Sequence, residues 1–90
     1  MNNRHITKQE ELVFTIQSLA HSININGGCV FCNNSGHTNQ LSVTIAENKV
    51  NYDVKLYRVD YLYYGHDLAS SVEEFEEVID RLKIELERWV

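Results

Sequence analysis

Residues 70–90 read SSVEEFEEVIDRLKIELERWV, and this stretch decides the fold. Its large apolar side chains recur at steps of three and four, the spacing that places them on one stripe of an α-helix. They are Phe75, Val78, Ile79, Leu82, Leu86 and Trp89. Ser70 and Ser71 each stand three residues before a glutamate, which is the pattern of a capping box. We therefore expect a helix over residues 70–90 whose apolar stripe covers the core.

The opposite face of this helix is acidic. Seven carboxylates and three cations give residues 70–90 a net charge of −4, out of −5 for the whole chain. The carboxylates of the outward face are Glu73, Glu76, Glu77, Asp80 and Glu87. Such a surface repels phosphate groups, so direct nucleic-acid binding is not expected there.

Length and composition predict one cytoplasmic domain. A chain of 90 residues can bury one modest core. No window approaches the roughly 18 apolar residues of a membrane span, and the polar start lacks the pattern of a secretory leader. Two cysteines without a leader favour a reducing compartment and free thiols.

Changes in hydrophobic period predict the remaining elements. Residues 1–6 are expected to be a frayed lead-in, followed by a helix over residues 7–22 that Thr7 and Glu10 cap. Asn24, Asn26, Gly27 and Gly28 break this helix. Alternating apolar and polar residues over 29–64, interrupted by polar turns, predict a meander of three strands.

The third strand contains a change of phase. Apolar side chains stand at even positions from Val50 to Leu56 and at odd positions from Tyr57 to Tyr63. A strand side chain changes face at every residue, so the shift requires a bulge, a break, or a strand buried on both faces. We favour a bulge near Leu56 and Tyr57.

The predicted fold class is α+β, with the element order α-β-β-β-α. Short turns favour an antiparallel three-stranded sheet, and each helix has one apolar stripe, so both helices are expected on one face. The other face of the sheet then stays open, and we expect the functional surface there.

The sequence CVFCNNSGH places Cys29, Cys32 and His37 at the spacing that opens a zinc knuckle. The fourth ligand position of such a knuckle holds Ser42, and two cysteines three apart in a strand face opposite ways. A redox pair would need a helix start after its first cysteine. A small zinc-binding or redox module centred on this motif stays the alternative, and we expect no metal and no cofactor.

Two sets of residues are candidates for partner binding. Tyrosine is common in binding hot spots, and the first set is Tyr57, Arg58, Asp60, Tyr61, Tyr63 and Tyr64. Neighbouring tyrosines of a strand point to opposite faces, so part of this set must belong to the core. The second set is Glu73, Glu76, Glu77 and Asp80, because a row of carboxylates imitates a phosphate backbone in a basic groove.

Catalysis finds no support in the sequence. There is no Ser-His-Asp arrangement with a nucleophile elbow, and Gly27-Gly28 lacks the lysine and serine of a phosphate-binding loop. We therefore expect a protein that is not an enzyme.

Small size, acidity, tyrosine content and element order make the chain similar to phage-encoded anti-CRISPR inhibitors. This resemblance implies a non-enzymatic inhibitor that binds a larger protein or complex, one that handles nucleic acid. Small immunity proteins and secretion chaperones look equally similar and would also act by binding protein. A homodimer that pairs through sheet faces or edges is a further possibility.

Overall fold

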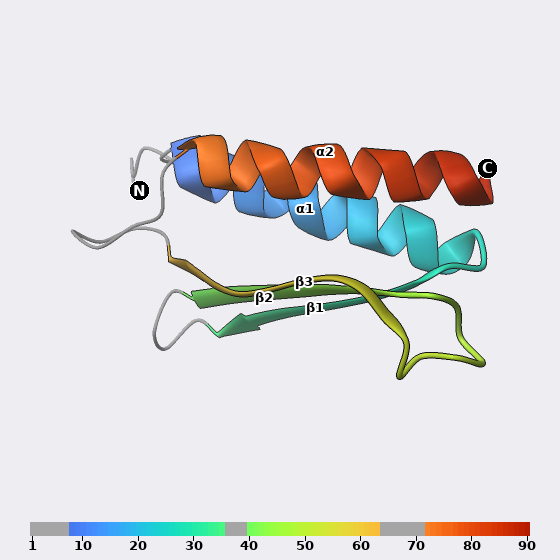
Figure 1. The fold of residues 1–90 in the computed structure, drawn as a ribbon. Coiled ribbons are helices and arrows are strands. Elements are labelled where there is room, and N and C mark those ends of the chain that lie inside the picture. Colours follow the sequence, from blue (N-terminus) through green and yellow to red (C-terminus); the bar gives the residue numbers. More distant parts are fainter. Residues whose placement is uncertain (1–7, 36–39, 64–71) are drawn as a thin grey trace, which may run out of the picture.

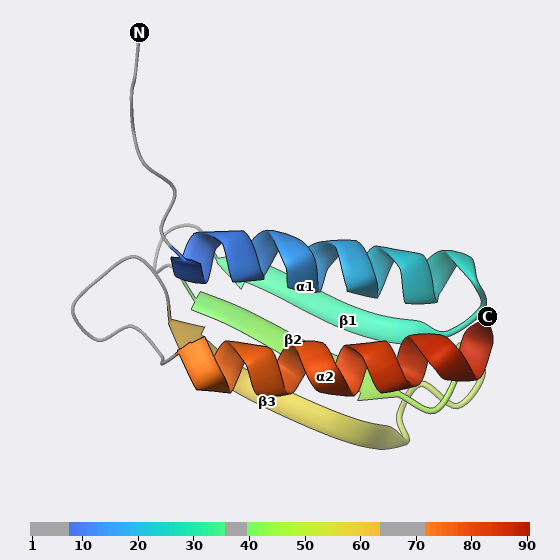
Figure 2. The same ribbon diagram turned by 90° about the horizontal axis from the view of Figure 1, so that it is seen from above.

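The computed structural model describes residues 8–35, 40–63 and 72–90. In chain order they form α1 (Lys8–Ile25), β1 (Cys29–Ser35), β2 (Gln40–Ala46), β3 (Lys55–Tyr63) and α2 (Val72–Trp89). β2 is the middle strand and pairs antiparallel with both neighbours. The predicted element order and the antiparallel three-stranded sheet are confirmed. Figures 1 and 2 show the two helices side by side over the same side of the sheet.

The apolar stripe of α2 covers the core as its spacing predicts. Phe75, Val78, Ile79 and Leu82 are buried, and Leu86 and Trp89 pack against them. α1 and the sheet supply the rest of the core, including Ile16, Ile23, Leu41, Val43 and Ile45. The proposed capping residues Thr7, Ser70 and Ser71 lie outside the described residues. Neither helix of the described part combines the length and apolar content that crossing a membrane requires.

α1 ends at Ile25, three residues beyond the predicted end, in a glycine-terminated cap. The amide of Gly28 donates to the carbonyl of Ile23 at 2.9 Å, and the amide of Gly27 donates to Asn24 at 3.4 Å. These two bonds satisfy carbonyls that the helix end would leave open. Gly27 has a φ of 106°, a conformation that L side chains rarely adopt. The two glycines therefore turn the chain sharply from α1 into β1.

The end of α2 closes over this turn. The indole of Trp89 lies against Gly27 and Gly28, and its Nε1 donates to the Glu85 carboxylate at 2.8 Å. Arg88 donates to the same carboxylate at 3.2 Å, so the buried charge of Glu85 has two partners. A buried carboxylate needs such partners, since desolvating an unpaired charge is costly. The last turn of α2 is thereby fixed against the α1–β1 connection.

The prediction that the third strand begins at Val50 is wrong. β3 begins at Lys55, and residues 47–54 form a loop that points Val50, Tyr52 and Val54 into solvent. The side chain of Asn48 accepts hydrogen bonds from the amides of residues 50 and 51, which gives the backbone an alternative to strand pairing. The alternating pattern here therefore belongs to a loop.

The predicted bulge near Leu56 and Tyr57 is confirmed. Ile45 pairs with Tyr57 while the next residue of β2, Ala46, pairs with Lys55, so β3 holds one extra residue there. A second register shift lies farther along, where Leu41 pairs with Leu62. Together the shifts allow both ends of β3 to turn core residues toward the helices.

Candidate functional site

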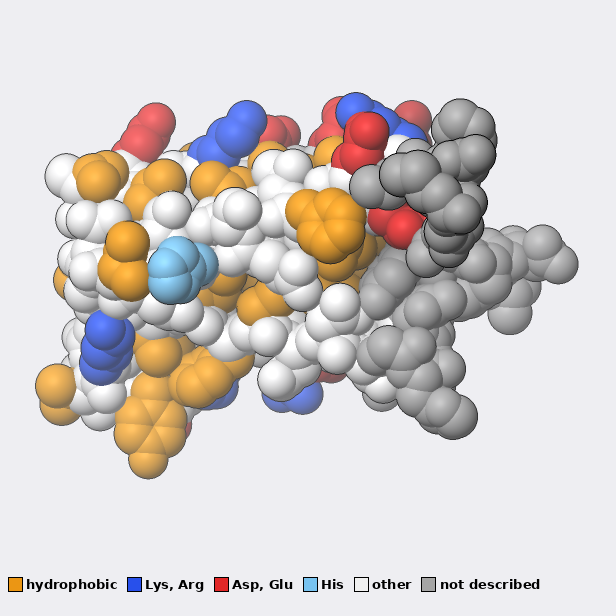
Figure 3. All heavy atoms as spheres, turned by 180° about the vertical axis from the view of Figure 1, so that it is seen from behind, with side chains coloured by type: hydrophobic (Ala, Val, Ile, Leu, Met, Phe, Trp, Pro, Cys, Tyr) orange, Lys and Arg blue, Asp and Glu red, His pale blue; other side chains and the backbone are white. Residues whose placement is uncertain are grey.

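Five large apolar side chains are exposed on β1, on β3 and on the loop that precedes β3. Phe31 is in β1, Leu56 is in β3, and the other three are in the 47–54 loop, which bends away from the helices in Figure 1. Figure 3 shows hydrophobic side chains protruding at this end of the sheet. We call this surface the apolar end. Its members are between 42% and 84% exposed: Phe31, Val50, Tyr52, Val54 and Leu56.

The geometry of the apolar end is held by backbone and cation contacts. The amide of Glu47 donates to the carbonyl of Val54 at 2.8 Å and closes the loop. The ammonium of Lys55 lies 4.9 Å from the ring centroid of Phe31 and donates to the carbonyl of Tyr52. A cation over an aromatic face is attracted to the ring quadrupole. Lys55 thus ties the loop to β1 while leaving the apolar side chains uncovered.

Tyr57, a predicted partner-binding residue, lies between the sheet and α2. It is half-buried against the core, and the guanidinium of Arg81 stands 5.1 Å from its ring centroid. Burial raises the pKa of the Tyr57 phenol, the Glu77 carboxylate raises it further, and Arg81 lowers it. Tyr57 therefore serves the packing of α2 and is not part of the open face.

The polar companions of the tyrosines lie on the open face. Arg58 shares a cross-strand row with Thr44 and Phe31, and its Nε lies 2.7 Å from the Asp60 carboxylate. Both side chains are well exposed, so water screens this pair and it adds little stability. Tyr64 and the side chains of Tyr61 and Tyr63 lie outside the described residues.

The acidic candidates of α2 form a row along its first turns. Glu73, Glu76, Glu77 and Asp80 are all exposed, and within the described residues no ion pair involves any of them. The row belongs to α2 in the helix layer, whereas the apolar end belongs to the sheet and the 47–54 loop below it (Figure 1). Of the two predicted sets, Tyr57 lies close enough to Glu77 for that carboxylate to raise its pKa, whereas Arg58 and Asp60 lie on the sheet face away from the helices.

The cysteine motif has the geometry of a strand. Cys29 and Cys32 lie in β1 three residues apart, on opposite faces, and both are free thiols. They cannot hold one ion together, and His37 lies outside the described residues. Burial raises the pKa of the Cys32 thiol, which opposes formation of the reactive thiolate. Over residues 8–35, 40–63 and 72–90, no three potential metal ligands cluster.

Sequence reasoning missed the apolar end because alternation over residues 50–56 was assigned to a strand. A signal against that assignment was available. Asn48, Asn51 and Asp53 are turn-forming residues, and three of them within six positions favour a loop over a strand.

The described structure defines a small two-layer α+β domain with an exposed apolar end on its sheet and an acidic row on its second helix. No protein-family model, curated protein or solved structure matches this chain.

Proposed function

We propose that this protein acts without catalysis, by binding another protein through the apolar end. The observation that supports this proposal is that five apolar side chains of β1, β3 and the 47–54 loop are 42–84% exposed: Phe31, Val50, Tyr52, Val54 and Leu56. Exposed apolar patches mark interaction sites, because their burial against a partner is favourable. Phe31 and Tyr52 supply the aromatic anchors that dominate the energy of such contacts.

A partner would gain most from the rings of the apolar end. Phe31 and Tyr52 are rigid, so ordering them in a complex loses little conformational entropy. Lys55, held over Phe31, adds a positive charge at the rim of an otherwise apolar contact. This composition, an apolar centre with a charged rim, is the usual anatomy of a protein–protein interface. In our proposal, the protein works in the cytoplasm, where its two thiols stay reduced.

The double substitution Tyr52→Ala/Leu56→Ala is expected to weaken partner binding by about 100-fold, because each truncated anchor costs on the order of 1–2 kcal/mol. The partner is first purified from the host together with this protein, and affinity is then measured by calorimetry with purified components. Ile84→Ala removes an equally exposed apolar side chain from α2 and should leave affinity within about twofold. Unchanged affinity in the double variant would exclude the apolar end as the binding surface.

The acidic row supports a narrower second form of the proposal, inhibition of a nucleic-acid-handling complex as in anti-CRISPR proteins. Four exposed carboxylates, for which no ion pair is seen among residues 8–35, 40–63 and 72–90, give this face of α2 a negative potential that suits a basic groove which normally holds phosphates. Because the row is on α2 and the apolar end is on the sheet and its loop, such a complex would have to contact both layers of the domain.

Removing two charges from the row tests this narrower form. Glu76→Gln/Asp80→Asn is expected to weaken binding by about tenfold at low salt and to flatten its salt dependence, since screening acts on the charges removed. The control Glu11→Gln/Glu87→Gln removes the same two charges outside the row, at exposed positions of α1 and of the last turns of α2, and should have a smaller effect. Identical affinity and salt slope in both variants would reject the row as a phosphate mimic. The proposal that the apolar end binds a partner would be unaffected by this result.

A further inference from the structure

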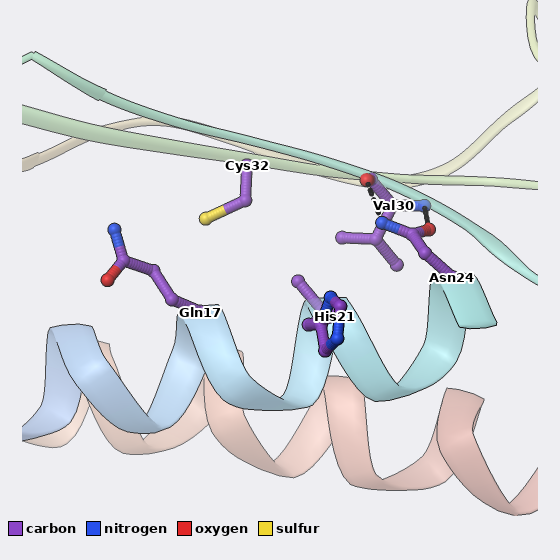
Figure 4. A pocket seen from close by; sticks show the side chains of 6 residues that line it. Gln17, His21, Asn24, Val30 and Cys32 are labelled. Atoms are coloured by element: carbon purple, nitrogen blue, oxygen red, sulfur yellow. Dashed lines mark hydrogen bonds between the residues drawn. The ribbon is translucent and has the colours of Figure 1, made fainter.

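β1 is an edge strand whose outward backbone groups are only partly paired. The carboxamide of Asn24 donates to the carbonyl of Val30 at 3.0 Å and accepts from the amide of Val30 at 2.7 Å. One residue of a neighbouring antiparallel strand would make the same two bonds. Asn24 therefore stands in for a strand residue at this position, as the dashed lines of Figure 4 show.

Cys32 is the next residue of β1 whose backbone amide and carbonyl point away from β2. Backbone groups of an antiparallel strand alternate between the paired side and the free side, so Cys32 turns its amide and carbonyl the same way as Val30. Within the part of the chain that the structure describes, no side chain caps these two groups. Cys32 therefore offers one donor and one acceptor to an incoming backbone.

A groove runs between this edge and α1. Its volume is about 340 Å³, and it is lined by Gln17, Ala20, His21 and Asn24 from the helix and by Val30 and Cys32 from the strand. Figure 4 shows Gln17 and Asn24 reaching from α1 toward the strand, while the sulfur of Cys32 points back toward the helix. Phe14 is 55% exposed and lies seven residues before His21, so it extends the same flank of α1.

The position of α1 limits what can occupy the groove. Seen from above, α1 runs along the outer side of β1 (Figure 2). An incoming segment would therefore lie next to α1. β1 itself has no acidic side chain, so a second copy paired through its own β1 would bring no carboxylate to the groove.

The charges around the groove further limit which segments could bind there. The groove lining contains no carboxylate, and His21 is its one ionisable side chain apart from the Cys32 thiol. At the Asn24 end, the ammonium of Lys49 lies 2.8 Å from the Asn24 carbonyl. A segment with an acidic side chain at that end would meet positive charge, in contrast to the acidic outer face of α2.

We propose that the β1 edge accepts an extended segment of a partner protein as a fourth strand. The segment's backbone pairs with Cys32, an acidic side chain approaches Lys49, and an apolar side chain rests on Phe14. Adding a strand to a free sheet edge is a recognised mode of peptide binding, in which main-chain hydrogen bonds give affinity. This surface adjoins the apolar end at Cys32 and Lys49, and the test below distinguishes the two proposals because its substitutions lie on α1, outside the apolar end.

The test uses the full chain and a phage-displayed library of linear 12-residue peptides. We expect selected peptides to contain an acidic residue and to bind the full chain. Bound peptide should slow hydrogen exchange of the Cys32 amide at least tenfold, while the amide of Val30, already capped, should change less. His21→Trp fills the groove from an exposed position and should weaken peptide binding at least tenfold. Ser18→Trp, the same change on the solvent side of α1, should bind as the parent chain does.

Several outcomes would overturn the proposal. They are the absence of selected peptides, equal binding by the His21→Trp and Ser18→Trp variants, and an unprotected Cys32 amide in the bound state. Protection of Cys32 in the chain alone, rising with concentration together with a dimer mass in light scattering, would mean that a second copy occupies the edge. Both tryptophan variants are checked by circular dichroism, and a third variant, His21→Tyr, which adds bulk without charge, replaces His21→Trp if the latter unfolds.

Discussion

Replacing Phe75 by alanine is expected to lower the free energy of unfolding by about 3–5 kcal/mol, the usual cost of removing a buried aromatic ring from a core. Phe75 is 0% exposed and is among the largest fully buried side chains of the described residues. It lies on the stripe with which α2 covers the core. The free energy of unfolding of a small domain is about 5–15 kcal/mol, so this single substitution removes a large part of the stability.

Urea denaturation followed by circular dichroism measures this loss. The midpoint should fall while the slope with urea stays constant, because the surface exposed on unfolding changes little. Ile84→Ala truncates a 59% exposed side chain of the same helix, and its effect should stay within about 0.5 kcal/mol. A loss below about 1 kcal/mol for Phe75→Ala would show that α2 does not pack as described.

Gly28→Ala is expected to destabilise the protein by about 2–3 kcal/mol, the range of overpacking in a filled site. A Cβ at this position would lie 2.4 Å from the Ile23 Cγ2 and 2.8 Å from the Trp89 Nε1. Neither neighbour can move freely, because Ile23 is a buried helix residue and Trp89 is hydrogen-bonded to Glu85. At an unconstrained site, the same substitution stabilises a protein by about 0.4–1 kcal/mol, so the expected sign is reversed.

Gly27→Ala is the matched control for this prediction. Its Cβ would stay 3.5 Å from Trp89, an ordinary contact, and only the φ of 106° opposes the change. We expect a cost of about 1–2 kcal/mol there. In thermal unfolding, the melting temperature of Gly28→Ala should therefore be lower than that of Gly27→Ala. A Gly28→Ala variant as stable as the parent chain would contradict the close packing of the α2 end on the turn.

The helices and the bulge could be predicted because each leaves a local signal. The stripe from Phe75 to Leu82 repeats at the helical period over several turns, and only one face of the helix can carry it into a core. The phase change near Tyr57 is equally local, because strand alternation has a fixed period of two. The break after α1 was visible in Gly27 and Gly28, although the helix continues to Ile25 before the cap forms.

The apolar end and the β1 edge could not be predicted from hydrophobic periodicity, although the turn-forming residues Asn48, Asn51 and Asp53 favour a loop at the apolar end. Val50 and Tyr52 alternate with polar residues as a strand would, and only the Asn48 side chain, which bonds to the backbone, turns them into a loop. The pairing of Asn24 with Val30 joins a helix to a strand, so no periodicity reports it. Tyr57 was assigned to a binding surface because the sequence does not show that α2 and Arg81 pack over it.

Hydrogen exchange of the protein in complex with its partner tests the central claim most directly, because it reports which amides the partner covers. The account predicts that protection rises in residues 47–56 and around Phe31, the strand and loop segments that carry the apolar end. Protection confined to the outer face of α2, with residues 47–56 exchanging as in the free protein, would contradict it.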